Sequence, residues 1–387
     1  IGPNKFGEAW AMYKPLVINS KINGNDFWNV AFNSGTGLLP TLISTTGYLG
    51  ILAWLVFFVL LIISGVKSIF SSIKNGVNWE TMAFFVLSLY LFVSAFFYST
   101  GPVIFLLAFA FAGIFIGLSA SHSKNGEIVM SFLNDHRKSF FSMLFIILLI
   151  IISAAASFKY LERFVSVPYF GKTLGAPTIP EAITFINKAI TLNSNDLYLR
   201  TYAQVYLVKF DSLIKKGTSL TDTEKADLQV SLDQAVNGAQ SAIIYNPRNY
   251  LNFQALGSVY QSLASFGVKD AYGKAIEAYK TASALNPLNP GLKLMIANSF
   301  LADGKTKDAK EYANLAISLK PDYIDALIVL SQIAKQEGNN TLALSYARTA
   351  LSLAPADKSL IQYVDSFKNT SSDDETPSNT TTDKKKQ

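Results

Sequence analysis

The sequence contains no cysteine, which excludes disulfides, cysteine-bound zinc and thiol nucleophiles. It has only two histidines, His122 and His136, and its first arginine is Arg137. We therefore predict no metal site and no cofactor. Charge is missing as well, because no Asp, Glu, Lys or Arg occurs between Glu80 and Lys124. An uncharged stretch of this length is typical of a chain that lies in a membrane.

Four apolar runs have the length that a membrane-spanning helix requires, which is about 20 residues. They cover residues 47–66, 81–100, 103–120 and 140–158. We predict a bundle of four transmembrane helices over residues 41–158, with the lipid bilayer as a partner. Residues 1–40 then form a loop before the first span. The chain begins at Ile1 without methionine, so we expect it to be the C-terminal piece of a longer protein.

The Lys and Arg residues of the short connections predict how the bundle is oriented, because cytoplasmic loops are enriched in both. The connections at residues 67–78 and 121–139 carry such residues, whereas the connection at 99–102 carries no charge. Residues 1–40 and everything after residue 159 are then outside the cytoplasm. The lysines in residues 1–40 argue in the opposite direction.

The second half of the chain is a separate, polar body that shows an internal repeat. Four of its residues recur at a constant offset of 34: Gly304, Ala309, Ala316 and Pro321 reappear as Gly338, Ala343, Ala350 and Pro355. This period resembles the tetratricopeptide repeat, a pair of antiparallel helices. We predict an all-α solenoid of about five repeats over residues 178–368, after a linker at 159–177. Residues 357–368 would cap it, and residues 369–387 would be a disordered tail.

Resemblance to tetratricopeptide repeats implies a concave groove lined by the first helix of each pair, which holds a peptide or protein partner. Lysines and acids alternate throughout this half of the chain, so we expect no nucleic acid. The groove would be amide-rich, which suits the peptide backbone or sugar hydroxyls. The alternative is a solvated helix face without a ligand. The predicted groove residues are Gln254, Ser258, Gln261, Asn298, Gln332, Lys335 and Gln336.

The first fifty residues contain four short motifs in a particular order. They are I-G-P-N-K-F at residues 1–6, A-M-Y-K-P at 11–15, D-F-W-N-V-A-F-N-S at 26–34 and T-T-G-Y-L-G at 45–50. This order resembles the O-antigen ligase and polymerase family, whose members are multi-pass glycosyltransferases. The resemblance implies a protein of the bacterial cytoplasmic membrane that transfers or polymerises a lipid-linked glycan, with its repeats outside the cytoplasm.

The chain departs from that family in the external loop, where active members use arginines and commonly a histidine. Only Lys5, Lys14 and Lys21 supply positive charge here, and Asp26 is the candidate base. Two interpretations stay open. In one, the lysines bind pyrophosphate and the protein is a glycan transferase. In the other, the protein is a non-catalytic membrane anchor for a tetratricopeptide scaffold, Lys14 is a solvated loop charge, and Trp28 is an anchor at the membrane interface.

Overall fold

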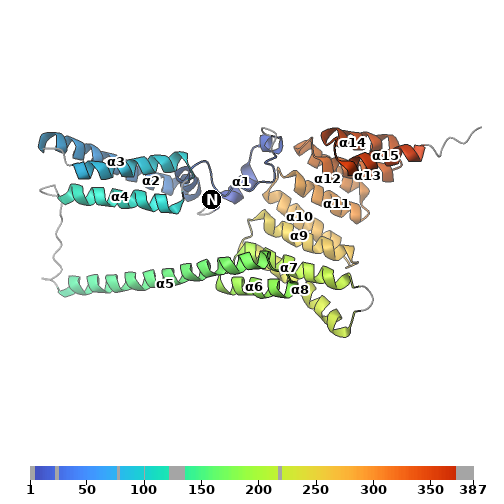
Figure 1. Ribbon diagram of the computed structural model, residues 1–387, viewed down its shortest axis with the longest axis horizontal. Coiled ribbons are helices and arrows are strands. Elements are labelled where there is room, and N and C mark those ends of the chain that lie inside the picture. Colours follow the sequence, from blue (N-terminus) through green and yellow to red (C-terminus); the bar gives the residue numbers. More distant parts are fainter. Residues whose placement is uncertain are drawn as a thin grey trace, which may run out of the picture. The chain divides into compact units, whose positions relative to one another are not determined.

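The computed structural model describes residues 5–21, 26–75, 79–99, 101–121, 136–216 and 220–371. All regular elements within these ranges are helical, which confirms the predicted all-α class (Figure 1). The chain divides into two units. The first unit consists of Ile1–Tyr13 and Ala31–Val167, and the second of Lys14–Val30 and Pro168–Gln387. His122, Lys124, the first four residues and most of the predicted tail are outside the described residues.

The first unit contains the apolar helices. A short helix, α1 (Phe6–Tyr13), precedes α2 (Leu38–Asn75), α3 (Trp79–Phe97), α4 (Pro102–Ser121) and α5 (His136–Leu174). Four segments are long and apolar enough to cross a membrane: Leu38–Phe70, Trp79–Phe97, Val103–Ala120 and a stretch within His136–Leu174. They coincide with the four predicted spans, so the protein associates with a membrane through four helices.

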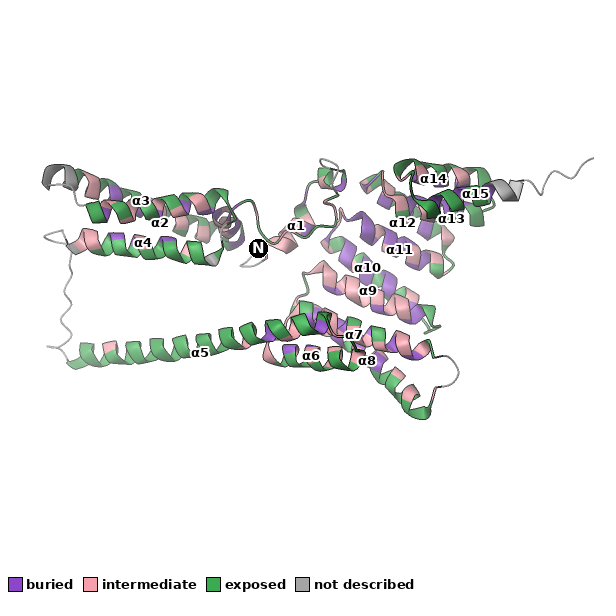
Figure 2. Ribbon diagram, in the orientation of Figure 1, coloured by how far each residue is buried: buried purple, intermediate pink, exposed green. Residues whose placement is uncertain are grey.

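Aromatic side chains pack α2, α3 and α4 together. Phe92 of α3 is buried and lies edge-on to Phe57, Phe58 and Phe109, with ring centroids 5.2–5.5 Å apart. Helices in lipid gain little from the hydrophobic effect, so close packing of this kind is what holds them together. The apolar length of α5, by contrast, is exposed along its course (Figure 2), as expected of a helix that contacts lipid.

Helix α2 begins nine residues before the predicted span and bends at Gly47, which has φ 72° and ψ −168°. Only glycine adopts this backbone conformation without a steric penalty. The T-T-G motif therefore marks a bend inside a helix, and the predicted start of the span coincides with that bend.

Helix α5 continues beyond its apolar part to Leu174, so residues 159–174 are helical where the sequence suggests a linker. An ion pair between Lys159 and Glu162 (2.8 Å), one helical turn apart, supports this extension. From Pro168 onwards the helix belongs to the second unit, where Phe170 stacks on Tyr198 with ring centroids 4.5 Å apart.

Ten further helices complete the second unit, and each packs on the next along the chain (Figure 1). The last turns of α5 contact α6, where the Lys188 ammonium lies 4.7 Å from the ring centroid of Tyr169. The pairs α7/α8, α9/α10, α11/α12 and α13/α14 follow, with α15 as the cap. The bounds are α6 Ile179–Leu192, α7 Asp196–Ile214, α8 Asp222–Tyr245, α9 Tyr250–Ser265, α10 Ala271–Leu285, α11 Pro290–Ala302, α12 Thr306–Leu319, α13 Ile324–Gln336, α14 Asn340–Leu353 and α15 Lys358–Ser371.

Small residues at the repeated positions allow these helices to approach closely. The repeated alanines, Ala316 among them, are fully buried. A Cβ added to Gly257 of α9 would lie 2.5 Å from the ring of Tyr279 on α10, closer than any real contact. Gly304 and Gly338 follow α11 and α13 with φ of 76° and 77°, so the turn within each pair requires glycine.

Enlarging one repeated alanine should destabilise the second unit. Replacing Ala316 with leucine inserts three carbons into a closed contact, and we expect the free energy of unfolding to fall by about 1–3 kcal/mol. The measurement is proteolytic susceptibility in increasing urea. Asn314→Leu, at an exposed position of the same helix, is the matched control and should leave the midpoint near that of the wild type. Equal midpoints for both variants would contradict the assigned packing.

Candidate functional site

A stretch from the loop before the first membrane span lies on the repeats. This loop segment, Lys14–Val30, belongs to the second unit although the residues on both sides of it belong to the first. It starts with a single 3₁₀ turn, Leu16–Asn19, and its residues 22–25 are outside the described part. The predicted loop of residues 1–40 is therefore divided between the two units.

Asn19 is the innermost residue of the loop segment, with 1% of its surface exposed. Its side-chain amide donates hydrogen bonds to the carbonyl oxygens of Leu288 (2.8 Å) and Leu319 (3.1 Å). Leu288 lies between α10 and α11, and Leu319 is the last residue of α12. Carbonyl groups at helix ends lack partners within the helix. One amide thus joins the loop segment to two successive junctions between repeats.

Lys320, the residue after α12, holds the loop segment by charge. Its buried ammonium donates to Asp26 Oδ1 (2.8 Å), Asp322 Oδ1 (2.9 Å) and the backbone oxygen of Asn19 (3.3 Å). Burial by itself lowers the pKa of Lys320, but the bonds to the two carboxylates outweigh burial and raise that pKa above 10.5. Lys320 therefore stays charged, and Asp26 neutralises it from the loop.

Lys14 closes the loop segment on itself. Its side chain is 4% exposed, and its ammonium donates a 2.8 Å hydrogen bond to the backbone oxygen of Trp28. Burial lowers the pKa of Lys14 from 10.5 to about 8, because the charged form loses its hydration. The bond links the two ends of the described segment and fixes the position of Trp28.

Trp28 is the aromatic contact of the loop segment. Its ring is tilted by 53° against that of Tyr323, with centroids 5.4 Å apart. A Cβ at position 291 would lie 3.0 Å from the indole, so Gly291, in the first turn of α11, gives the ring its room. Trp28 therefore packs on the repeats, in contact with Tyr323 and Gly291.

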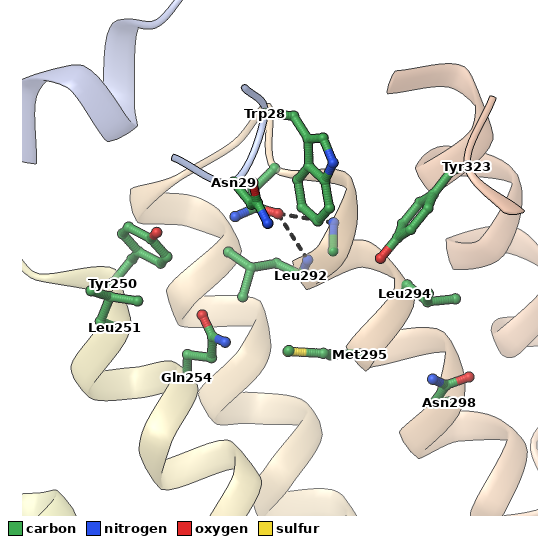
Figure 3. Close-up of a pocket in the computed structure, with 12 residues that line it drawn as sticks. Trp28, Asn29, Tyr250, Leu251, Gln254, Leu292, Leu294, Met295, Asn298 and Tyr323 are labelled. Carbon is green, nitrogen blue, oxygen red and sulfur yellow. Dashed lines mark hydrogen bonds between the residues drawn. The ribbon is translucent and has the colours of Figure 1, made fainter. Parts of the chain in front are cut away.

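A cavity of about 400 Å³ lies beneath Trp28 (Figure 3). Two of its residues come from the loop segment, and the others come from the start of α9, from α11 with the turn before it, and from Tyr323. The lining residues are Trp28, Asn29, Tyr250, Leu251, Gln254, Asn289, Gly291, Leu292, Leu294, Met295, Asn298 and Tyr323. All of them are uncharged.

Two of the seven predicted groove residues, Gln254 and Asn298, line this cavity. Ser258 and Gln261 lie further along α9, where both bond to the Tyr279 hydroxyl at 3.2 and 2.8 Å.

The other three predicted groove residues are exposed on α13, outside this cavity: Gln332, Lys335 and Gln336. The Lys335 ammonium lies 5.1 Å from the ring centroid of Phe367. The cavity thus brings together two of the seven predicted groove residues.

The candidate catalytic residues are divided between the two units. Lys5 belongs to the first unit and pairs with Glu8 at 2.5 Å. Lys14 and Asp26 make the structural contacts given above, and Lys21 is exposed on the second unit. Within the described ranges, no group of three or more His, Asp or Glu side chains is arranged to hold a metal ion.

Sequence reasoning missed the residues that hold the loop segment: Asn19, Lys320 and Tyr323. The repeat pattern does not distinguish them, because Lys320 occupies a junction position where the neighbouring repeats have Asn286 and Ala354. A lysine beside a helix end normally signals solvent exposure. Its burial depends on a partner some 300 residues away in sequence.

A comparison with known families identifies the helical pairs α11/α12 and α13/α14. The sequence profile of the tetratricopeptide repeat matches residues 291–323 and 324–357, which contain α11 to α14. Residues 291–357 of the second unit are therefore tetratricopeptide repeats. The chain is also 31% identical over 90 residues to the human protein O-mannosyl-transferase TMTC1, a match that covers 23% of this chain and 10% of that protein.

Several solved tetratricopeptide structures are similar to this chain. A thermophilic repeat protein from Thermus thermophilus is 18% identical, with a TM-score of 0.38, over 55% of this chain and 99% of its own. YrrB, described as a repeat protein with an unusual peptide-binding site, is also 18% identical, with a TM-score of 0.37, over 52% of this chain and 92% of its own.

The pKa of Lys14 predicts how binding of the loop segment depends on pH. Between pH 8 and 10.5 the released segment binds more protons than the docked one, so docking should strengthen as the pH rises through this range. Spin labels on Val17→Cys and Thr349→Cys would report the docked fraction, since the native chain has no cysteine.

The matched control is Lys14→Met, which cannot titrate. The Lys14→Met protein should lack the rise in docking between pH 8 and 10. Any effect of pH on docking through other titrating groups, such as Lys320, is the same in both proteins. A rise of equal size in the Lys14→Met protein would show that Lys14 is not the group responsible.

Proposed function

We propose that this chain is part of a membrane glycan transferase of the O-antigen ligase type, in which tetratricopeptide repeats bind and position the loop before the late membrane helices. The observation that carries this proposal is the docking of the loop segment on α10 to α13 through Asn19, Asp26 and Trp28. The proposed substrate is a lipid-linked glycan. Tetratricopeptide repeats are protein-interaction domains, and here the first peptide bound is a segment of the same chain.

The docked segment contains parts of two motifs that resemble that family. Lys14 comes from A-M-Y-K-P and Trp28 from D-F-W-N-V-A-F-N-S, and one hydrogen bond joins them. The two motifs therefore act together in one folded loop. The human relative, by its printed name, is an O-mannosyl-transferase, which supports the sugar-transferase class for the region of similarity.

In this proposal Lys14 and Asp26 are positioning residues. Lys14 is buried against a backbone oxygen, and Asp26 is paired with Lys320, so neither side chain is directed to a pyrophosphate. Their role is to fix the loop. We infer that the cations contacting the donor lie elsewhere, since Lys5 is paired with Glu8 as well.

A second candidate function is a non-catalytic scaffold, anchored by four helices, that binds peptides or proteins. The contacts of Lys14 and Asp26 favour this function. Both charged groups are bound within the protein, to the Trp28 backbone oxygen and to Lys320, and are not available to a donor substrate. The exposed polar face of α13 would then be the surface for a partner.

Transfer by the protein in proteoliposomes, with a lipid-linked oligosaccharide as donor, separates these functions. Lys320→Met removes the buried charge that holds Asp26 and Asn19, so we expect it to release the loop and lower turnover at least about tenfold. Lys307→Met, which changes an exposed lysine of α12, should keep turnover within about twofold of the wild type.

Failure of the wild type to transfer with any donor would overturn the transferase and favour the scaffold. Turnover unaffected by Lys320→Met would show that docking of the loop is not needed. A strong loss of turnover in Lys5→Ala or Lys21→Ala would show that these lysines bind the donor.

We further propose that the protein is in the bacterial cytoplasmic membrane with its repeats outside the cytoplasm, as the Lys and Arg of its connections suggest. In intact spheroplasts, Asn314→Cys on the exposed face of α12 should react with a membrane-impermeant maleimide. Ser139→Cys, near the start of α5, should react only after permeabilisation. The reverse pattern would place the repeats in the cytoplasm.

A further inference from the structure

We propose that the cavity beneath Trp28 binds an uncharged sugar unit. This inference rests on the proposed function and deepens it by assigning a saccharide site that the loop segment and the repeats form together. Its volume of about 400 Å³ is near the lower end of the 300–1,000 Å³ that ligand pockets occupy in proteins.

The walls of the cavity present aromatic rings and its base presents aliphatic side chains. Trp28 and Tyr323 lie next to one another on one side, and Tyr250 lies across the cavity from them (Figure 3). Leu292 and Met295 lie between these sides. A sugar ring has apolar C–H faces and a polar rim, so it needs flat apolar surfaces together with hydrogen-bonding groups at their edge.

Gln254 and Asn298 supply those hydrogen-bonding groups. Both are half-buried, and neither side chain forms a hydrogen bond with another described residue. A side-chain amide carries two donor hydrogens and one oxygen acceptor, which matches hydroxyl groups that both donate and accept. Two neighbouring amides already form hydrogen bonds: the Asn289 oxygen accepts from Gly291 and Leu292, and the Asn19 nitrogen donates to Leu288 and Leu319.

The lack of charge in the lining selects the class of ligand. Phosphate and carboxylate groups are held in proteins by Arg or Lys, often through paired hydrogen bonds. Two positive groups at the loop are already engaged: the Lys320 ammonium is bound to Asp26 and Asp322, and the Lys14 ammonium donates to the Trp28 backbone oxygen. The site therefore suits a neutral saccharide rather than the pyrophosphate of a donor lipid.

The loop segment forms part of the site, since Trp28 and Asn29 both line it. A sugar in the cavity contacts the docked loop and the repeats at once, so it must stabilise docking, and docking must strengthen sugar binding by the same factor. The repeats thereby connect the position of the loop to the presence of glycan.

Saturation-transfer NMR and calorimetric titration of the whole protein in nanodiscs test this site, with two uncharged sugars, maltotriose and N,N′,N″-triacetylchitotriose, as probes. Gln254→Leu and Asn298→Leu replace the side-chain amide with an apolar group and so remove its hydrogen bonds. Each should weaken binding of the sugar at least about tenfold. Gln336→Leu, an exposed amide outside the cavity, should leave the affinity within about twofold. Unchanged circular dichroism would confirm that each variant is folded.

Asn19→Ala gives an independent measurement, because it releases the loop without changing the cavity lining on the repeats. It should weaken sugar binding too, and saturating sugar should restore part of the docking that spin labels at positions 17 and 349 report. Equal affinity in Asn19→Ala and wild type would overturn the shared site.

Absence of binding of either sugar to the wild type would overturn the proposal, and so would undiminished binding by Gln254→Leu. Binding of an uncharged decapeptide of glycine, serine and asparagine that Gln254→Leu abolishes, without any sugar binding, would identify a peptide site instead. Sugar binding without transfer in proteoliposomes would overturn the transferase alone, whereas transfer without sugar binding would overturn only this site.

Discussion

The ion pair between the buried ammonium of Lys320 and the partly exposed carboxylate of Asp26 is the interaction on which the position of the loop segment depends. A buried charge is tolerated only when its partners are in place, because the loss of hydration otherwise costs several kcal/mol. Asp322 alone provides one carboxylate, and the loop supplies the second together with the Asn19 oxygen. Docking of the loop thus completes the coordination of Lys320 and fixes Trp28 above the cavity.

The four membrane helices and the repeated helical pairs could be predicted because both arise from local patterns. Apolar length identifies a span, and a 34-residue recurrence of Gly304, Ala309 and Ala316 identifies helix contacts between neighbours in sequence. The extent of α5 could not be predicted in this way. Its residues 159–174 are polar enough for a linker, and their helicity follows from the helices on which Tyr169 and Phe170 pack.

The candidate site was predictable only in part, for a physical reason. Gln254 and Asn298 are among the residues that the resemblance to tetratricopeptide repeats places in a groove, and both line the cavity. Asn19 and Trp28 were not assigned to that face, since the contacts between Asn19 and Leu319 join residues 300 positions apart. No local propensity encodes such a contact. The charged residues proposed for catalysis were identified by type, but their partners, Lys320 and the Trp28 carbonyl, decide what they do.

The chain passes from the first unit to the second after Tyr13, returns at Ala31, and crosses again at Pro168. The loop segment is therefore a ligand tethered at both ends, and its effective concentration at the repeats is of millimolar order, as for sites joined by short connections. A free peptide that binds the same junctions must outcompete a resident segment that never diffuses away. Because the loop segment is tethered, weak contacts are enough to keep it bound to the repeats. The covalent connection therefore disfavours binding of foreign peptides at the same junctions.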